Sequence, residues 1–238
     1  MATADTRLAV WLGLVCALIG QAVSAQAAGG QVPQIETEAR TLVILGASYA
    51  NGLGQPPLPG FARVVNRGVG GDNTAAMLAR FSTDVASLKP AAVLIWGHVN
   101  NITQARAEGI EGAKQAAREH YVEMLRRARD AGIEPIFATE IPWTEPTGFL
   151  NTLYGWYAAL AGKTSYAARV SGHVREVNEF LKSLCQRERC RVLDFEAVFA
   201  NKTGTRRSEY ASDDGSHISR AGYAALTAYA ARELRRTP

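Results

Sequence analysis

Short apolar runs alternate along the chain with segments in which apolar residues recur every three or four positions. The runs are rich in branched side chains, which is typical of strands buried on both faces of a sheet. They lie at 41–45, 62–66, 91–96, 134–139 and 191–195. The periodic segments indicate amphipathic helices, and they cover 77–88, 117–128, 170–184 and 223–234. Strands that alternate with helices predict an α/β fold: a three-layer α/β/α sandwich with a five-stranded parallel sheet and right-handed crossovers.

Polar residues stand where two of these helices are expected to begin. Asp72 is expected to cap the first helix and Ser219 the last one, because both side chains accept hydrogen bonds from the free N–H groups of a first turn. The first helix is expected to bury Met77, Phe81, Val85 and Leu88.

A long connection at 142–166 follows the fourth strand. Its large aromatic residues are Trp143, Phe149, Tyr154, Trp156 and Tyr157. Connections of this length inside a domain are often lids or binding loops. We therefore expect Trp143, Tyr154 and Trp156 to line a substrate pocket, and the alternative is a helical hairpin that packs its rings into the core.

The first 25 residues have the features of a signal peptide. The apolar segment 8–20 is shorter than a membrane span, and the small residues Val23-Ser24-Ala25 offer a cleavage site. Cleavage near Ala27 and an uncleaved anchor are the alternatives. The interpretation is a periplasmic or secreted bacterial protein with no stable membrane span after processing. Residues 26–40 then form a linker, and residues 41–238 form the folded domain.

The composition and charge of the chain indicate which classes of binding partner to expect. The 238 residues are 47% hydrophobic, which suffices for one full core. The formal net charge is +4, but the basic residues are scattered, and no base-reading motif accompanies them. We therefore expect no nucleic-acid partner.

Export also changes the expected oxidation state of the cysteines. Cys185 and Cys190 form an even pair once the segment that contains Cys16 is removed, so a short-loop disulfide is expected in an oxidising compartment. Two unpaired thiols are the alternative. No further cysteine or histidine stands nearby at ligand spacing, and no metal is expected.

A serine and a histidine stand where one parallel sheet edge would bring them together. Ser48 follows the first strand, and His217 comes after the fifth. A serine hydroxyl becomes a nucleophile when a base takes its proton, and the base needs a group that orients it. Asp214, three residues before the histidine, is expected to orient it, and Asp213 is the alternative. The predicted catalytic triad is Ser48, Asp214 and His217.

Two further strand ends supply donors for an oxyanion. The N–H groups of Ser48 and Gly71 and the side-chain amide of Asn100 are the expected oxyanion hole. His98 stands near these residues and is expected to line the pocket.

Four blocks of the chain resemble those of the SGNH hydrolase superfamily, the GDSL-type esterases. They are Gly46-Ala47-Ser48, Asn66 to Asp72, Gly97 to Asn101, and Asp214-Gly215-Ser216-His217. Ala47 and Asn101 stand where the family usually has aspartate. The resemblance implies a flavodoxin-like sandwich, Ser48 as nucleophile, Gly71 and Asn100 as oxyanion donors, and no cofactor.

The function expected from this resemblance is cleavage of carboxylic esters or thioesters through an acyl-enzyme. The alternatives are a polysaccharide O-acetyl esterase, an acetyl-transferring relative, and an inactive carbohydrate-binding relative. Nucleotide binding is disfavoured, because neither a Gly-x-Gly-x-x-Gly turn nor a Walker lysine follows the first strand. The expected partner is an ester of a small molecule, glycan or lipid.

Overall fold

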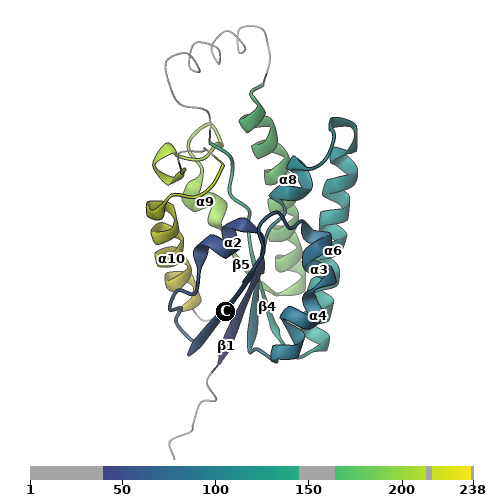
Figure 1. Ribbon diagram of the computed structural model, residues 1–238, viewed down its shortest axis with the longest axis vertical. Helices are drawn as coiled ribbons and strands as arrows, with labels where there is room; N and C mark the ends of the chain where they lie inside the picture. Colours follow the sequence, from purple (N-terminus) through teal and green to yellow (C-terminus); the bar gives the residue numbers. More distant parts are fainter. Residues whose placement is uncertain (1–39, 145–163, 213–215, 237–238) are drawn as a thin grey trace, which may run out of the picture. The chain divides into compact units, whose positions relative to one another are not determined.

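A parallel sheet lies at the centre of the computed structural model, which describes residues 40–144, 164–212 and 216–236 (Figure 1). Its strands are β1 (Thr41–Gly46), β2 (Arg63–Gly68), β3 (Ala92–Trp96), β4 (Glu134–Ala138) and β5 (Arg191–Leu193). The strand order is β2-β1-β3-β4-β5, and every neighbouring pair is parallel. The predicted five-stranded parallel sheet is confirmed, and its order is the flavodoxin-like one.

Two hydrophobic cores cover the faces of this sheet. Alternate residues of β1 point to opposite faces: Leu42 and Ile44 belong to one core, and Val43 and Leu45 to the other. The first core is completed chiefly by helices α2 (Ser48–Leu53), α9 (Phe195–Phe199) and α10 (Arg220–Leu234). The second is completed by α3 (Thr74–Ala79), α4 (Phe81–Asp84) and α6 (Ile110–Asp130). The predicted α/β/α sandwich is confirmed (Figure 1).

The longest described helix, α8 (Tyr166–Glu188), contributes to both cores. Val170 and Val174 of its first half pack into the first core, whereas Val177 and Leu181 of its second half pack into the other. The remaining described helices are short: α5 (Val99–Thr103) and the 3-10 turns η1 (Ala86–Leu88), η2 (Ala107–Gly109) and η3 (Ser208–Tyr210).

The first predicted helix differs from the structure. The chain turns at Arg80, so the segment is divided among α3, α4 and η1, and Leu88 is 40% exposed rather than buried. Asn73, not Asp72, caps α3, because its side chain accepts the N–H groups of Ala75 and Ala76. The prediction for α10 is confirmed: the Ser219 hydroxyl accepts the N–H of Gly222 at 3.1 Å.

The last strand is also shorter than predicted. Asp194 accepts the N–H of Ala197 at 3.2 Å and thereby caps α9. A capping residue leaves strand geometry to start the helix, so β5 stops at Leu193 and Phe195 is helical.

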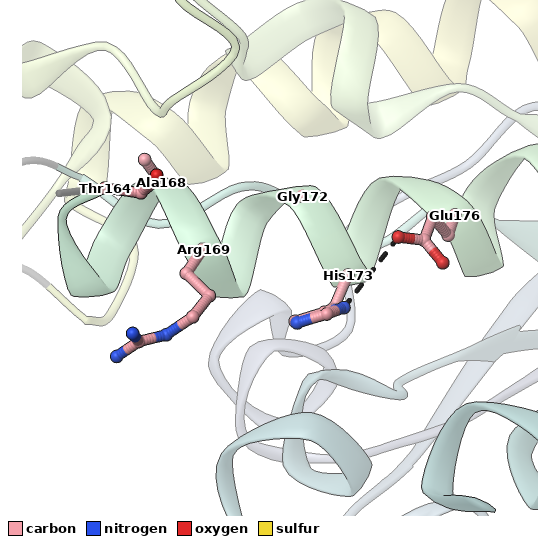
Figure 2. Close-up of a pocket in the computed structure, with 6 residues that line it drawn as sticks. All are labelled: Thr164, Ala168, Arg169, Gly172, His173 and Glu176. Carbon is pink, nitrogen blue, oxygen red and sulfur yellow. Dashed lines mark ion pairs between the residues drawn. The ribbon is translucent and has the colours of Figure 1, made fainter. Parts of the chain in front are cut away.

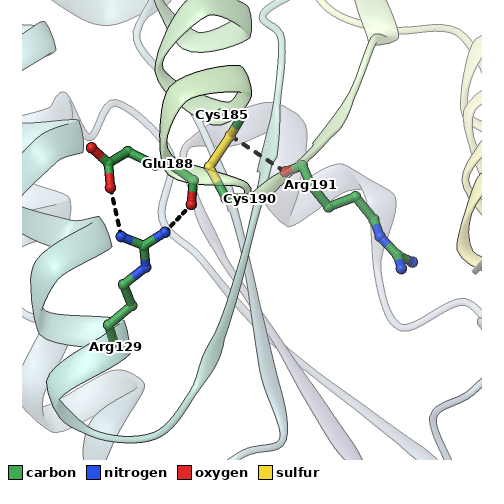
Figure 3. The surroundings of a disulfide bond; sticks show 5 residues. All are labelled: Arg129, Cys185, Glu188, Cys190 and Arg191. Atoms are coloured by element: carbon green, nitrogen blue, oxygen red, sulfur yellow. Dashed lines mark hydrogen bonds and ion pairs between the residues drawn. A yellow bond between two sulfur atoms is a disulfide. The ribbon is translucent and has the colours of Figure 1, made fainter. Parts of the chain in front are cut away.

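A disulfide closes the turn between α8 and β5 (Figure 3). It joins Cys185 and Cys190, the pair that the sequence analysis singled out, with Cα atoms 4.5 Å apart. The N–H of Cys190 also donates to the carbonyl of Cys185 at 3.0 Å. Arg129 of α6 pairs with Glu188 at 2.7 Å in the same turn. This end of the fold is therefore fastened both covalently and by charge.

None of the helices in the described part of the chain has the combination of length and hydropathy that a membrane span needs. All described residues fall within one compact unit, Thr37–Pro238. Ser48, Gly71 and Asn100 follow the carboxyl ends of β1, β2 and β3, which meet at one edge of the parallel sheet.

Candidate active site

Ser48 begins helix α2 immediately after β1, with only Ala47 between. Gly46 makes this abrupt turn feasible, because a Cβ atom there would lie 2.2 Å from the carbonyl oxygen of Trp96 and 2.5 Å from Ala50. The serine is half-buried. Its N–H lies in the first turn of the helix, where backbone donors have no intrahelical acceptor. The residue thus combines a hydroxyl with a neighbouring free donor, as an acyl-transfer nucleophile requires.

The glycine-rich loop after β2 lies next to this turn. The N–H of Val69 donates to the carbonyl of Gly46 at 3.0 Å. Gly71 has a φ of +83°, a conformation that glycine adopts without strain. Asn100 donates through Nδ2 to the carbonyl of Asp72 at 2.8 Å, and its amide has a second N–H to offer. The structure therefore brings Asn100 of α5 to the loop that contains Gly71, so that the two expected oxyanion donors lie close together.

Arg80 holds this loop against the turn between β1 and Ser48, a role that sequence reasoning missed. Its guanidinium bonds Asp72 at 2.7 Å, the carbonyl of Gly46 at 2.9 Å and the carbonyl of Arg67 at 2.7 Å. A planar fork with five donors suits such multiple contacts. Asp72 is thus an ion-pair partner that fixes the loop instead of a helix cap.

Asn101, where the family usually has aspartate, braces α5 against α3. Its Oδ1 accepts the N–H of Thr74 at 3.0 Å, and its Nδ2 donates to the Thr74 hydroxyl at 2.9 Å. That hydroxyl in turn lies 2.9 Å from His120 Nδ1. The residue is buried, and its bonds to Thr74 attach α5, the helix that contains Asn100, to α3.

The expectation that His98 lines the pocket is wrong. Its ring is fully buried between the sheet and helices α6 and α8, with Nδ1 3.0 Å from the Tyr121 hydroxyl and Nε2 3.2 Å from the carbonyl of Val174. Burial lowers the pKa of His98 to about 4, so the ring is neutral near pH 7. Both ring nitrogens therefore make hydrogen bonds inside the protein and do not face a pocket.

His217, the expected base, contacts the residue that follows Ser48. Its ring is exposed and meets Tyr49 edge to face, with centroids 6.3 Å apart and planes at 86°. Tyr49 directly follows Ser48 on α2, so the structure places the expected base beside the helix of the expected nucleophile. The expected orienter Asp214, and its alternative Asp213, lie outside the described residues.

Of the expected aromatic pocket residues, Trp143 is described, whereas Tyr154 and Trp156 lie outside the described residues. The Trp143 ring is half-buried and packs against Tyr166 at the start of α8, with ring centroids 5.6 Å apart. Its main chain accepts the N–H of Arg206 and donates to the Ser171 hydroxyl, both at 2.9 Å. Trp143 is therefore firmly attached to the framework around the sheet edge.

A buried carboxyl group, Glu140, lies close behind this edge. It accepts the N–H of His98 at 3.1 Å, while its own main chain is bonded twice to the Asn178 side chain. Burial raises the pKa of Glu140 to about 8, although the His98 N–H and the charge of Arg206 oppose the shift. The group is therefore largely protonated near neutral pH. Sequence reasoning missed it, although an acidic residue in an otherwise uncharged apolar segment was a signal.

Replacing Glu140 by glutamine should change how stability depends on pH. The folded-state pKa of about 8 exceeds the ordinary value of 4.5, so the wild type loses stability as pH rises from 4.5 to 8. The full shift corresponds to roughly 4–5 kcal/mol of unfolding free energy. We expect Glu140→Gln to gain stability over the wild type by several kcal/mol between pH 5 and pH 9.

Chemical denaturation at pH 5, 7 and 9 measures this change. Glu108→Gln, at an exposed position of η2, is the matched control and should follow the wild type. If the unfolding free energies of Glu140→Gln and the wild type changed in parallel with pH, this carboxyl would not take up a proton on folding.

A cluster of metal-ligating side chains lies elsewhere, on the face of α8 that meets α6. Potential ligand atoms of Glu111, His173 and Glu176 lie within 4.8 Å of one another. The ammonium of Lys114 already bridges the two carboxylates, at 2.6 Å from Glu111 and in contact with Glu176. His173 and Glu176 also line a surface hollow of about 520 Å³, into which Arg169 extends (Figure 2). A buried lysine thus supplies the positive charge that the cluster needs.

Comparison with known proteins identifies the family to which this chain belongs. The GDSL-like lipase/acylhydrolase family matches residues 27–225. A curated relative, the uncharacterized lipoprotein YqeF of Bacillus subtilis (strain 168), is 33% identical over 107 residues, and the alignment spans 44% of this chain and 44% of that one.

Solved structures share the fold. A GDSL-like lipase from Bacteroides thetaiotaomicron VPI-5482 has a TM-score of 0.63 at 16% identity and covers 82% of this chain and 88% of its own. An acetyl xylan esterase from Geobacillus stearothermophilus has a TM-score of 0.61 at 16% identity, covering 82% and 94%. The family match extends over most of the chain and includes Ser48, the glycine-rich loop, Asn100 and His217. The chain belongs to the GDSL-like lipase/acylhydrolase family.

Proposed function

We propose that this protein is an exported serine esterase that cleaves carboxylic esters through an acyl-enzyme on Ser48. The observation that carries the proposal is the contact of the His217 ring with Tyr49, the residue after Ser48. This contact brings the proposed base to the residue after the proposed nucleophile, although the two are far apart in the sequence. The four matching sequence blocks and the family membership support the same assignment.

In the proposed reaction, His217 takes the proton of the Ser48 hydroxyl as Oγ attacks the ester carbonyl. The negative oxygen that forms is stabilised by the N–H groups of Ser48 and Gly71 and by the Asn100 amide. His217 returns the proton to the departing alcohol, which leaves Ser48 acylated. Water, deprotonated by the same histidine, then releases the carboxylic acid and restores the serine. Asp214 is proposed to orient the imidazole throughout.

Acetylated polysaccharide is a second candidate substrate class. The fold neighbour from Geobacillus stearothermophilus is named an acetyl xylan esterase. The same triad would release acetate from a sugar hydroxyl, and aromatic rings such as Trp143 stack well on sugar faces. An acetyl-transferring relative would use the same residues with a sugar hydroxyl in place of water.

Export is proposed from the sequence of residues 1–25 and from the relative in Bacillus subtilis, whose name calls it a lipoprotein. The mature protein would then work in the periplasm or outside the cell. N-terminal sequencing of the protein recovered from a periplasmic fraction tests this, with a start after Ala25 or Ala27 as the expected result.

Hydrolysis rates over a series of ester substrates test the function. p-Nitrophenyl esters from acetate to dodecanoate should be assayed beside acetylated xylan and acetylated peptidoglycan, with Ser48→Ala as the blank. Turnover above that blank supports the esterase. A strong preference for acetyl esters and release of acetate from xylan would favour the polysaccharide substrate. Equal rates for the wild type and Ser48→Ala on every substrate would refute the proposal and favour an inactive carbohydrate-binding relative.

Removal of the Asn100 amide should slow the reaction without weakening binding. The loss of one oxyanion donor typically lowers kcat by about 10²–10³, and we expect Asn100→Ala to do so with little change in KM. Steady-state kinetics on a p-nitrophenyl ester measures both constants.

Asn101→Ala is the neighbouring control, because its hydrogen bonds go to Thr74. It should lower the unfolding free energy by about 1–3 kcal/mol, since a buried N–H loses its acceptor. A larger kcat loss for Asn101→Ala than for Asn100→Ala would mean that the wrong asparagine has been assigned to the oxyanion hole.

A further inference from the structure

The main chain around His217 is held by a buried arginine that the proposed reaction does not use. Arg206 lies in the connection between α9 and η3 and is 1% exposed. Its own backbone is fixed, since its N–H donates to the carbonyl of Trp143 at 2.9 Å and it bridges Ala200 in antiparallel fashion. The direction of its side chain is therefore determined by the framework around the sheet edge.

The guanidinium makes four hydrogen bonds, chiefly to carbonyl oxygens. Nε donates to Pro142 at 2.8 Å, one Nη donates to the carbonyl of His217 at 2.5 Å, and the other donates to the carbonyl of Ser216 at 3.0 Å. The second Nη also reaches the Tyr49 hydroxyl at 2.8 Å. Two consecutive carbonyls of the histidine segment are thus bound by one rigid planar group.

Tyr49 completes the connection to the nucleophile. Its hydroxyl donates to the carbonyl of Ser216 at 2.7 Å, its ring lies under the Arg206 guanidinium, and it packs against the His217 ring in a T-shaped arrangement. Burial raises the pKa of Tyr49 to about 12, so the hydroxyl keeps the proton that it donates. Because Tyr49 follows Ser48 in α2, the same residue touches both halves of the proposed catalytic pair.

We propose that Arg206 is a positioning residue: with Tyr49 it fixes the main chain of His217 relative to the helix that begins at Ser48. This inference rests on the proposed function, in which His217 is the base. Burial of a charged guanidinium is costly unless its donors are satisfied, and here two of its four hydrogen bonds go to the segment that carries the histidine. The imidazole itself stays exposed.

The test compares Arg206→Lys, Arg206→Ala and Tyr49→Phe with Arg207→Ala. Arg207 is the matched control, because it is adjacent in the chain and its contacts are the carbonyl of Ala200 and the ring of Tyr210. Lysine keeps the charge but cannot reproduce the fork. Tyr49→Phe removes only the hydroxyl.

The kinetic readout is the division between kcat and KM for p-nitrophenyl acetate. A small displacement of a catalytic group costs about 10²-fold in rate, and we expect Arg206→Lys to lower kcat by about 10–100-fold with KM nearly unchanged. Tyr49→Phe should act in the same direction by less, and Arg207→Ala should not. In a His217→Ala background the Arg206→Lys change should cost less than about twofold, because the residue acts through the histidine.

Hydrogen exchange of the backbone amides at 216–219 gives a readout that needs no activity. These amides should exchange faster in Arg206→Lys than in the wild type or Arg207→Ala. If Arg206→Ala folds, its exchange at 216–219 is measured as well. If it does not fold, the result for Arg206→Lys alone decides the test. An unchanged kcat, an equal loss in both histidine backgrounds, or unchanged exchange would overturn the positioning role. If the wild type is no faster than Ser48→Ala, the esterase proposal fails separately, and exchange still decides whether Arg206 holds this segment.

Discussion

Replacement of Ser48 by alanine should lower kcat by about 10⁵–10⁶, the loss seen when a triad nucleophile is removed. The residual rate would come from substrate binding and from the oxyanion donors, which the substitution leaves in place. Ser48 is half-buried at the start of α2, and loss of its hydroxyl leaves the packing of Tyr49 and Ala50 unchanged. The melting temperature should therefore stay close to that of the wild type, so that kinetics and thermal unfolding together isolate the chemical step.

Ser82→Ala is the matched control for this experiment, because Ser82 is an exposed serine of α4 on the opposite face of the sheet from α2. It should retain full activity. If Ser48→Ala kept more than about a tenth of the wild-type kcat, the loss would be below the 10²-fold that even a single oxyanion donor contributes. Ser48 would then not be the nucleophile.

Replacement of His217 by alanine should have the second largest effect. Without the base, the Ser48 hydroxyl keeps its proton, and kcat should fall by about 10⁴–10⁶. The exposed ring touches Tyr49, while the contacts of the segment with Arg206 and Ser212 use the carbonyl of residue 217, which alanine retains. Kinetics of His217→Ala beside thermal unfolding measures the effect.

His173→Ala is the control, since that ring lies on α8 beside Lys114. It should leave kcat unchanged. The double variant Ser48→Ala, His217→Ala should be no slower than either single variant, because residues that act as one unit are not additive. Additive losses would place the histidine outside the reaction of the serine. Asp214→Asn and Asp213→Asn in the same series identify the orienter, which should be Asp214.

The sheet, and the edge at which the candidate site residues lie, could be predicted from sequence because both depend on local patterns. Each strand is a short apolar run, and parallel topology alone brings the residues after β1, β2 and β3 to one edge. The placement of Ser48, Gly71 and Asn100 at this edge could therefore be predicted without knowledge of any long-range contact. The same patterns could not show that the chain turns at Arg80, because that arginine is held by distant groups, the carbonyls of Gly46 and Arg67.

The hydrogen bonds that join Arg206, Tyr49 and the His217 segment could not be predicted either, because they also connect distant parts of the sequence. Arg206 and Tyr49 stand 157 positions apart, and neither sequence neighbourhood signals the other. His98 was misplaced because its position at a strand end says nothing of which way the ring turns. Here Tyr121 and Val174 offer hydrogen-bonding partners in the interior, and the ring points to them.

Covalent labelling with a fluorophosphonate tests the central claim most directly. The probe phosphonylates an activated serine and stops there, so it reports the nucleophile independently of substrate identity. Intact-protein mass spectrometry should find one adduct per molecule, peptide mapping should place it on Ser48, and Ser48→Ala should remain unlabelled. Labelling of Ser48→Ala to the same extent as the wild type, or an adduct mapped to another residue, would contradict the account.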